Sequence, residues 1–312
     1  MTEDQKKIVE EIKANDQHPE RGEIELAKDD LGFEYFQRIS SSHLESWHQN
    51  GQLWASCAIK DGKADGLYKE WNSKGNLVFR ENYKMGTKEG LAEGWYDSGQ
   101  LWTRGNYKNG EKDGVQENWF MNGQLASSTN YENGQLEGLQ ESWYESGQIA
   151  VSSNYKNDRL DGLQEVWWEN GKLARRTYYK DDKKEGLERG WHENGLLAYE
   201  GRFKNGIRDG VHKVWYENGR LFRLMSLVEG VRNGIEKEWS KDGKLVYQKN
   251  FKDNKLDGLQ KEVNADGTLT QYLYKDGAKQ LIKPVDLFEQ PSTQETQKKI
   301  TIKSKKTSGI KR

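Results

Sequence analysis

Side chains suited to acid–base, nucleophilic or metal chemistry are few in this sequence and do not cluster. The chain has one cysteine, Cys57, and its histidines are His18, His43, His48, His192 and His212. His48 and His192 each follow a tryptophan, where other segments place Tyr144 or Tyr216, so we expect them to replace an aromatic side chain. Cys57 has no neighbouring histidine in its own segment and is interpreted as a small strand residue. Because no glycine-rich phosphate-binding pattern occurs either, we predict a protein that is not an enzyme and carries no cofactor or metal.

A regular series of charges points to binding rather than to catalysis. The candidate partner-binding residues are acidic at Glu93, Glu117, Glu141 and Glu165 and basic at Arg189, Lys213 and Lys237. The longer segments agree, because residues 90–161 carry 5 basic and 11 acidic groups while residues 162–257 carry 20 and 16. Two interpretations stay open. Each charge could pair with an opposite charge on the adjoining strand, or the series could form a bipolar surface that steers and orients a partner.

These charges stand two residues before members of a tryptophan series with a spacing of 24 residues. Nine of the 12 tryptophans follow this spacing: Trp47, Trp71, Trp95, Trp119, Trp143, Trp167, Trp191, Trp215 and Trp239. Glycines, tyrosines and leucines repeat with the same period. The period predicts an array of about ten units over residues 42–281. It also explains why a chain of 312 residues with a net charge of only -1 holds 33 glycines and so many tryptophans.

Two turn signals divide each unit. The first is an Asn-Gly or Ser-Gly pair such as Ser146-Gly147, and the second is a pair such as Asn133-Gly134. Asn-Gly between strand-like runs favours a two-residue type I′ hairpin, and helical spacing of apolar residues is missing from the units. We predict an all-β fold: an elongated, twisted, single-layer antiparallel meander of about ten 24-residue β-hairpin repeats, with a short N-terminal helix.

The turn prediction also assigns side chains to the two faces of the sheet. Pairing across the first turn puts Trp143 opposite Ala150 and Tyr144 opposite Ile149, on opposite faces. A tryptophan ladder would then cover one face, and a ladder of tyrosines and leucines the other. We expect the stacked aromatic side chains to form the core of this aliphatic-poor chain.

The pattern G-L-x-E-x-W-Y-E-N-G-Q-L followed by Y-K-N-G resembles the bacterial variant of the MORN (membrane occupation and recognition nexus) repeat. The resemblance covers about ten units, from Ser42 to about Leu281. The units lack the Tyr-x-Gly-x-Trp opening and the Gly-x-Gly pair of the eukaryotic repeats, so the lipid-binding roles proposed for those repeats transfer poorly. Bacterial proteins of the variant family are commonly assigned as antitoxins of toxin–antitoxin pairs, and the resemblance implies such a role. It implies no catalytic residues.

The segments outside the array have simpler interpretations. Residues 1–41 are predicted to form an N-terminal helix and cap that closes the first edge strand, with a helix over residues 2–14 that begins with a capping box of Thr2 and Gln5. Residues 282–312 are predicted to be a basic, disordered tail, because residues 278–312 carry 9 basic and 3 acidic groups. The N-terminus lacks the features of a secretory signal, and no stretch is apolar enough to span a membrane. We therefore expect a cytoplasmic location.

Two hypotheses for the function follow. The first is a non-enzymatic protein-binding module, an antitoxin or immunity-type protein that neutralises a partner protein, such as a cognate toxin, by binding it. The alternative is a structural scaffold that assembles proteins or tethers them to an anionic membrane through the basic C-terminal tail. The array as a whole is not basic, which argues against nucleic acid as a partner. We expect a monomer.

Overall fold

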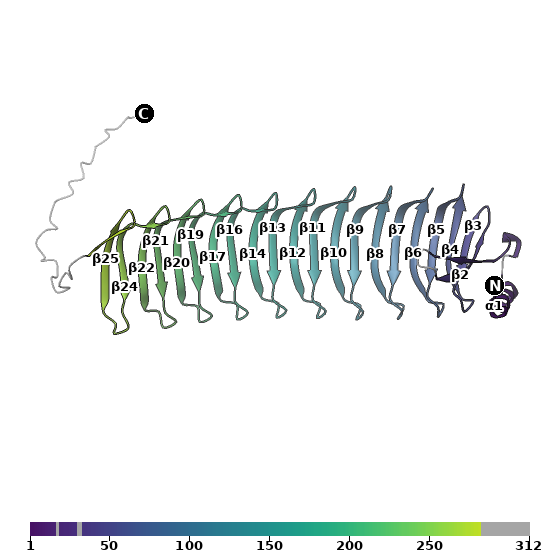
Figure 1. Cartoon of the computed structure of the whole chain (residues 1–312), viewed down its shortest axis with the longest axis horizontal. Coiled ribbons are helices and arrows are strands. Elements are labelled where there is room, and N and C mark those ends of the chain that lie inside the picture. The colour runs from purple at the N-terminus through teal and green to yellow at the C-terminus, as the bar shows by residue number, and fades with distance from the viewer. Residues whose placement is uncertain (17–18, 30–32, 282–312) are drawn as a thin grey trace, which may run out of the picture.

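The array forms a single open β-sheet in the computed structural model, which describes residues 1–16, 19–29 and 33–281. The described residues contain one α-helix, α1 (Glu3–Ala14), one short 3₁₀ helix (Pro19–Arg21) and 26 strands that all belong to one antiparallel sheet. Figure 1 shows the strands stacked side by side along the long axis, with α1 at the N-terminal end. The predicted basic tail, residues 282–312, lies outside the described residues, as does His18.

The strands follow one another along the sheet in chain order. The first four are β1 (Glu25–Lys28), β2 (Glu34–Ile39), β3 (His43–Trp47) and β4 (Leu53–Lys60). The next ten are β5 (Lys63–Trp71), β6 (Leu77–Lys84), β7 (Thr87–Trp95), β8 (Leu101–Lys108), β9 (Glu111–Trp119), β10 (Leu125–Glu132), β11 (Gln135–Trp143), β12 (Ile149–Lys156), β13 (Arg159–Trp167) and β14 (Leu173–Lys180). The last twelve are β15 (Lys183–Lys184), β16 (Gly186–Trp191), β17 (Leu197–Lys204), β18 (Ile207–Arg208), β19 (Gly210–Trp215), β20 (Leu221–Val228), β21 (Val231–Trp239), β22 (Leu245–Lys252), β23 (Lys255–Leu256), β24 (Gly258–Val263), β25 (Leu269–Lys275) and β26 (Ala278–Leu281).

Each 24-residue repeat supplies two antiparallel strands, as β11 and β12 do. The short strands β15, β18 and β23 are the first parts of strands that a bulge interrupts before β16, β19 and β24. Each described strand pairs with its neighbours along the chain, so the described strands form a meander that runs from β1 to β26. The predicted fold class is confirmed.

The two turns of a repeat differ, and only the second is the predicted type. Between β10 and β11, Asn133 and Gly134 have φ values of 48° and 80°, as a two-residue type I′ turn requires. Between β11 and β12 the connection is five residues long, from Tyr144 to Gln148. Only Gly147 is left-handed there, with φ 82°, and its N–H donates to the carbonyl of Tyr144. The prediction of a type I′ turn at Ser146-Gly147 was wrong.

This longer turn changes which side chains share a face. A β-bulge brings Trp143 opposite Ile149 and Ser142 opposite Val151, so Ala150 has no direct partner. The predicted pairs of Trp143 with Ala150 and of Tyr144 with Ile149 were therefore wrong. Because an extra residue in one strand reverses the alternation of side chains, the leucine series lies on the tryptophan face. Leu221 and Trp239, for example, line one hollow together with Lys237.

We call the tryptophan face the open face and the other the crowded face. On the crowded face the middle of each strand is closely packed: Ser153, Thr177 and Gln260 are each 1% exposed. On the open face, every ladder tryptophan after Trp47 is only half-buried. The expectation that the aromatic ladder forms a buried core was therefore wrong, because a single-layer sheet has no second layer to cover it.

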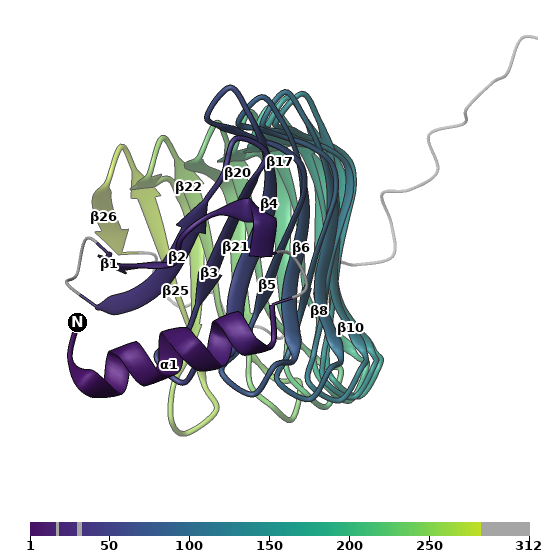
Figure 2. The same cartoon turned by 90° about the vertical axis from the view of Figure 1, so that its right-hand side faces the viewer.

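Among the residues that the structure describes, a conventional apolar core occurs only at the N-terminal end. There α1 packs across the open face of the first strands, where Val9 and Ile12 meet Phe36 and Trp47. Figure 2, seen from that end, shows the helix crossing the strands. Helix α1 begins with the predicted capping box of Thr2 and Gln5. It covers a face of the sheet, and β2 pairs with β3, so the N-terminal segment covers the first strand of the array and leaves the four-residue strand β1 at the edge.

Candidate binding surface

The seven predicted partner-binding residues lie in one continuous row across the open face. Each stands directly opposite the next row member on the adjoining strand, because the repeat places two strands every 24 residues. The row, which we call the charged row, contains Arg38, Glu45, Ser56, Lys69, Arg80, Glu93, Arg104, Glu117, Ser128, Glu141, Ser152, Glu165, Arg176, Arg189, Glu200, Lys213, Leu224, Lys237, Gln248, Lys261 and Gln271.

Three of the seven residues are neutralised by ion pairs along the row. Glu93, 4% exposed, accepts hydrogen bonds from Arg80 on one side and from Arg104 Nε at 3.1 Å on the other. Glu165 accepts from Arg176 Nε at 2.6 Å. Arg189 Nε donates to Glu200 at 2.8 Å. For these residues the cross-strand pairing interpretation is confirmed.

The other four residues keep their charges available. Within residues 1–16, 19–29 and 33–281, the side chains of Glu117, Glu141, Lys213 and Lys237 have no ion pair and no side-chain hydrogen bond, and each is half-buried. Along the row, Ser128 separates the two glutamates and Leu224 separates the two lysines. One stretch of the open face therefore carries unpaired acidic groups, and a second stretch carries unpaired basic groups.

Apolar side chains flank the charged row on both sides. One flank is an aliphatic row in which Val115 and Leu139 are 46% and 47% exposed, and Val211 and Ile235 are 46% and 39% exposed. The other flank is the row of half-buried tryptophans. Sequence reasoning missed the aliphatic row, although its period of 24 residues was available. The aliphatic residues alternate with polar ones on the adjoining strands, such as Asn154 opposite Leu139 and Asn250 opposite Ile235. Exposed apolar groups that recur in this way beside free charges favour an interaction surface.

The crowded face carries the bonds that hold successive repeats in register. The hydroxyl groups of Tyr144 and Tyr216 donate to the carbonyl of the ladder tryptophan in the next repeat, at 2.8 and 2.9 Å. His48 and His192 make the same contact through Nε2, at 2.9 and 3.1 Å. The prediction that these histidines replace aromatic residues is confirmed, and their role is structural.

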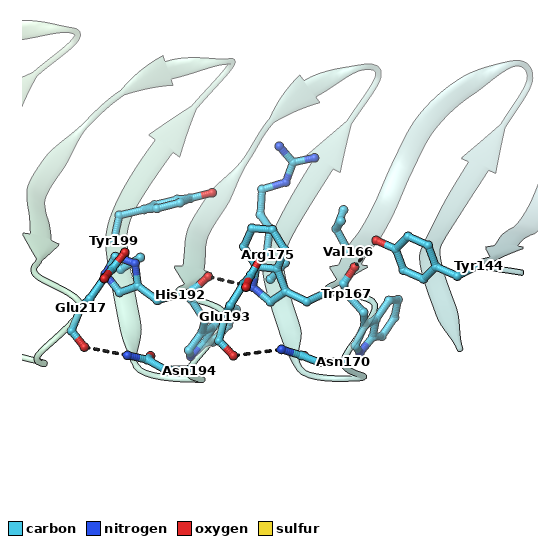
Figure 3. A pocket seen from close by; sticks show the side chains of 14 residues that line it. Tyr144, Val166, Trp167, Asn170, Arg175, His192, Glu193, Asn194, Tyr199 and Glu217 are labelled. Atoms are coloured by element: carbon cyan, nitrogen blue, oxygen red, sulfur yellow. Dashed lines mark hydrogen bonds between the residues drawn. The ribbon is translucent and has the colours of Figure 1, made fainter. Parts of the chain in front are cut away.

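A groove of about 970 Å³ opens on the crowded face between the fifth and eighth tryptophans of the ladder. Its floor contains Ala174 and Ala198, whereas Trp102 and Phe222 fill the equivalent positions of other repeats. Figure 3 shows Tyr144, His192, Tyr199 and Arg175 around the groove. Arg175 donates to Gln164 at 3.2 Å through one terminal nitrogen. Its Nε is buried without a partner in the described part of the chain.

Two buried groups on the crowded face have shifted pKa values. Burial lowers the pKa of His212 below its ordinary value, and the hydrogen bond to Arg202 O only partly opposes this. Burial raises the pKa of the Cys57 thiol, so the thiolate is disfavoured and the interpretation of Cys57 as a small strand residue is supported. No cluster of three or more potential metal ligands occurs among the described residues. The only described α-helix, α1, is too short to cross a membrane.

Together these features define a class of protein: an open, single-layer array of β-hairpins whose open face carries unpaired charges between rows of half-buried side chains. The family model of the MORN repeat variant matches seven segments of the chain, residues 64–85, 88–109, 112–133, 136–157, 160–181, 184–205 and 232–253. The array is therefore built of MORN repeats of 24 residues. The repeat between the last two segments, where Leu227 and Val228 replace the usual Tyr-Lys pair, is not matched.

No curated protein matches the chain. MORN repeats generally bind proteins or membrane lipids and are typically not catalytic.

Proposed function

We propose that this chain is a non-enzymatic, protein-binding antitoxin or immunity-type module that neutralises a partner protein by covering it with the open face. The observation that carries the proposal is the unpaired charge on that face. Glu117 and Glu141 form an acidic stretch, and Lys213 and Lys237 form a basic stretch, between two rows of half-exposed apolar side chains. Desolvated apolar groups supply affinity at such a surface, while the bipolar charge fixes the orientation of the partner.

The rigidity of the array supports the same proposal. Successive repeats are joined by backbone pairing and by side-chain bonds such as that from Tyr144 to the carbonyl of Trp167. The binding groups therefore keep fixed spacings before a partner arrives, which lowers the entropy that binding costs. Because the partner interface spans several repeats, it would cover a large area of the neutralised protein.

Capture of partners from the native host tests this proposal. The full chain should retain one stoichiometric protein, and the double charge reversal K213E/K237E should weaken its capture by about tenfold or more while the circular dichroism spectrum is unchanged. These lysines suit the test because neither makes an ion pair in the described residues, so their reversal breaks no internal contact. The matched control is K74E, an exposed lysine in the turn between β5 and β6.

Neutralisation needs its own measurement. Expression of the captured protein alone should inhibit growth, and coexpression of the wild-type chain, but not of K213E/K237E, should restore it. Equal capture by wild type and K213E/K237E would contradict binding of the partner through the charges of the open face. Recovery of anionic lipid with no stoichiometric protein would contradict protein binding altogether.

A further inference from the structure

The charged row is antisymmetric about Arg189. Two, four and six positions before Arg189 the row carries acidic side chains, which are Glu165, Glu141 and Glu117. Two, four and six positions after it the row carries basic side chains, which are Lys213, Lys237 and Lys261. The immediate neighbours, Arg176 and Glu200, are also opposite in charge. Within six positions of Arg189, reversing the direction of the row therefore exchanges each acidic position with a basic one. Arg189 itself lies at the centre and is neutralised by Glu200 of its own chain.

We propose that the open face binds a second copy of this chain, with the two arrays face to face and running in opposite directions. The two-fold axis would run parallel to the strands, through Arg189. Glu141 of each copy then faces Lys237 of the other, and Glu117 faces Lys261. The spacings match because both partners repeat at about 4.8 Å per strand. The inference rests on the proposed function only in that both use the open face. It differs from the sequence-based expectation of a monomer.

The charges select this symmetry over the other face-to-face arrangement. A two-fold axis along the length of the array would place Glu141 on Glu141 and Lys237 on Lys237. Like charges brought together in an interface cost several kcal/mol. Of the two arrangements, only the reversed one makes the free charges complementary.

The apolar rows beside the charged row are compatible with the same axis. In the reversed arrangement Leu139 faces Ile235 of the other copy, and Leu163 faces Val211. Trp167 likewise faces Trp215. Six row positions on each side of Arg189 span about 60 Å, and the three rows are about 15 Å wide, so roughly 1,800 Å² would be buried in total. A specific and stable interface buries about 1,200–2,000 Å².

Charge swaps test the proposal directly. The wild-type chain, of 36.2 kDa, should sediment at twice that mass, and added salt should weaken the association. K237E alone and E141K alone should each raise the dissociation constant by about tenfold or more, because each places like charges at two symmetric contacts. An equimolar mixture of the two single variants should restore the dimer, since every contact is then again between opposite charges. The double variant E141K/K237E should also restore it.

The control is K74E, whose position has no counterpart within the reversed overlap and which should dimerise as wild type does. Wild-type protein that stays monomeric over the accessible concentration range would overturn the inference. So would a dimer that K237E leaves intact, or one that the mixture of single variants does not restore. Circular dichroism of each variant identifies any loss of fold. The mixture of K237E and E141K then distinguishes lost charge complementarity from unfolding, because two unfolded chains cannot form the dimer together.

The double variant also separates this inference from the proposed function. Swapping both charges preserves complementarity between two identical copies but reverses the field presented to a different protein. A dimer restored in E141K/K237E together with lost capture of the partner would support both statements. If the wild-type chain is monomeric but still captures a partner through Lys213 and Lys237, the face-to-face dimer is contradicted and the proposed function is supported.

Discussion

His212 shows how a single residue adapts to its place in the repeat. It lies on the crowded face opposite Gly201, where an added Cβ would meet the imidazole at 2.0 Å. Its Nε2–H donates to the carbonyl of Arg202 at 2.9 Å. Gln116 makes the same contact to the carbonyl of Asn106, also at 2.9 Å, and it too stands opposite a glycine, Gly105. At Gly201 the rigid imidazole ring occupies the space that a Cβ would need, so glycine suits this site. The equivalent glutamines Gln140 and Gln164 stand opposite Thr129 and Ser153, because a glutamine side chain can move aside.

The lowered pKa of His212 predicts a pH-dependent stability. The unfolded chain takes up the proton near the ordinary pKa of 6.5, whereas the folded chain does so only at lower pH. The free energy of unfolding should therefore fall as the pH drops below about 6.5. H212Q, which installs the side chain of the equivalent repeats, should lose less stability between pH 7.5 and pH 5.5 in urea titrations.

The reciprocal variant Q116H provides the control. It should introduce an additional loss of stability over the same pH range, because its environment matches that of His212. Identical pH profiles for wild type and H212Q would show that this histidine does not govern the dependence.

At the scale of the strand and the turn, side-chain bonds between repeats define the array. In most repeats the residue after the ladder tryptophan reaches the carbonyl of the next one, as Tyr96 does to Trp119 at 2.7 Å. The turn asparagines add a second contact: Asn122 donates to the carbonyl of Glu145, 23 residues on, while its own carbonyl oxygen accepts from Gln124 N–H. These two bonds, rather than a positive φ, explain asparagine before the turn glycine.

Phe120 and Tyr144 offer a matched test of these contacts. They occupy equivalent positions, but Phe120 has no hydroxyl group to donate to the carbonyl of Trp143. Y144F should lower the free energy of unfolding by about 1 kcal/mol, and F120Y should raise it by a similar amount. Urea denaturation of both variants checks the pair, and opposite signs are the essential result. A change of the same sign in both would show that ring packing outweighs the hydrogen bond.

At the scale of the whole molecule, stability is distributed along the array. Strands pair only with their neighbours in the chain, and the apolar cluster under α1 reaches no further than β4. Linear arrays of this kind have stabilities close to a sum of nearest-neighbour terms. The interior repeats are therefore interchangeable to a degree that the residues of a globular core are not.

Deletion of one complete repeat, residues 138–161, should be tolerated. The new junction joins Glu137 to Gly162, so Ser128 would face Glu165 in place of Glu141 and the rows would remain continuous. The array should shorten by two strands, or about 10 Å, in small-angle scattering, with its circular dichroism retained. Deletion of residues 138–149 alone should instead disrupt pairing at the junction and lower the free energy of unfolding, because a single lost strand reverses the direction of all later strands relative to the earlier ones. Unfolding of the 24-residue deletion would contradict nearest-neighbour stability.

Much of this fold could be predicted from local pattern. The period of 24 residues predicts two strands per repeat and the meander, and Asn133-Gly134 predicts a type I′ turn. The same 24-residue alignment predicted that His48 and His192 take the place of tyrosine, and both make the tyrosine contact. The alignment of the seven charges followed as well, since residues one period apart must occupy equivalent places along the array.

The faces and the partners of those charges depended on the tertiary structure. A five-residue turn and the bulge at Ala150 place the tryptophan and leucine series on one face, and no residue type at the Ser146-Gly147 pair distinguishes this turn from a two-residue one. Whether Arg104 pairs with Glu93 or Glu117 depends on rotamers and burial, because both lie directly opposite it. The sequence by itself determined the repeat and its order. Only the three-dimensional packing decided the side-chain face and the charges left unpaired, because both depend on one-residue shifts between strands.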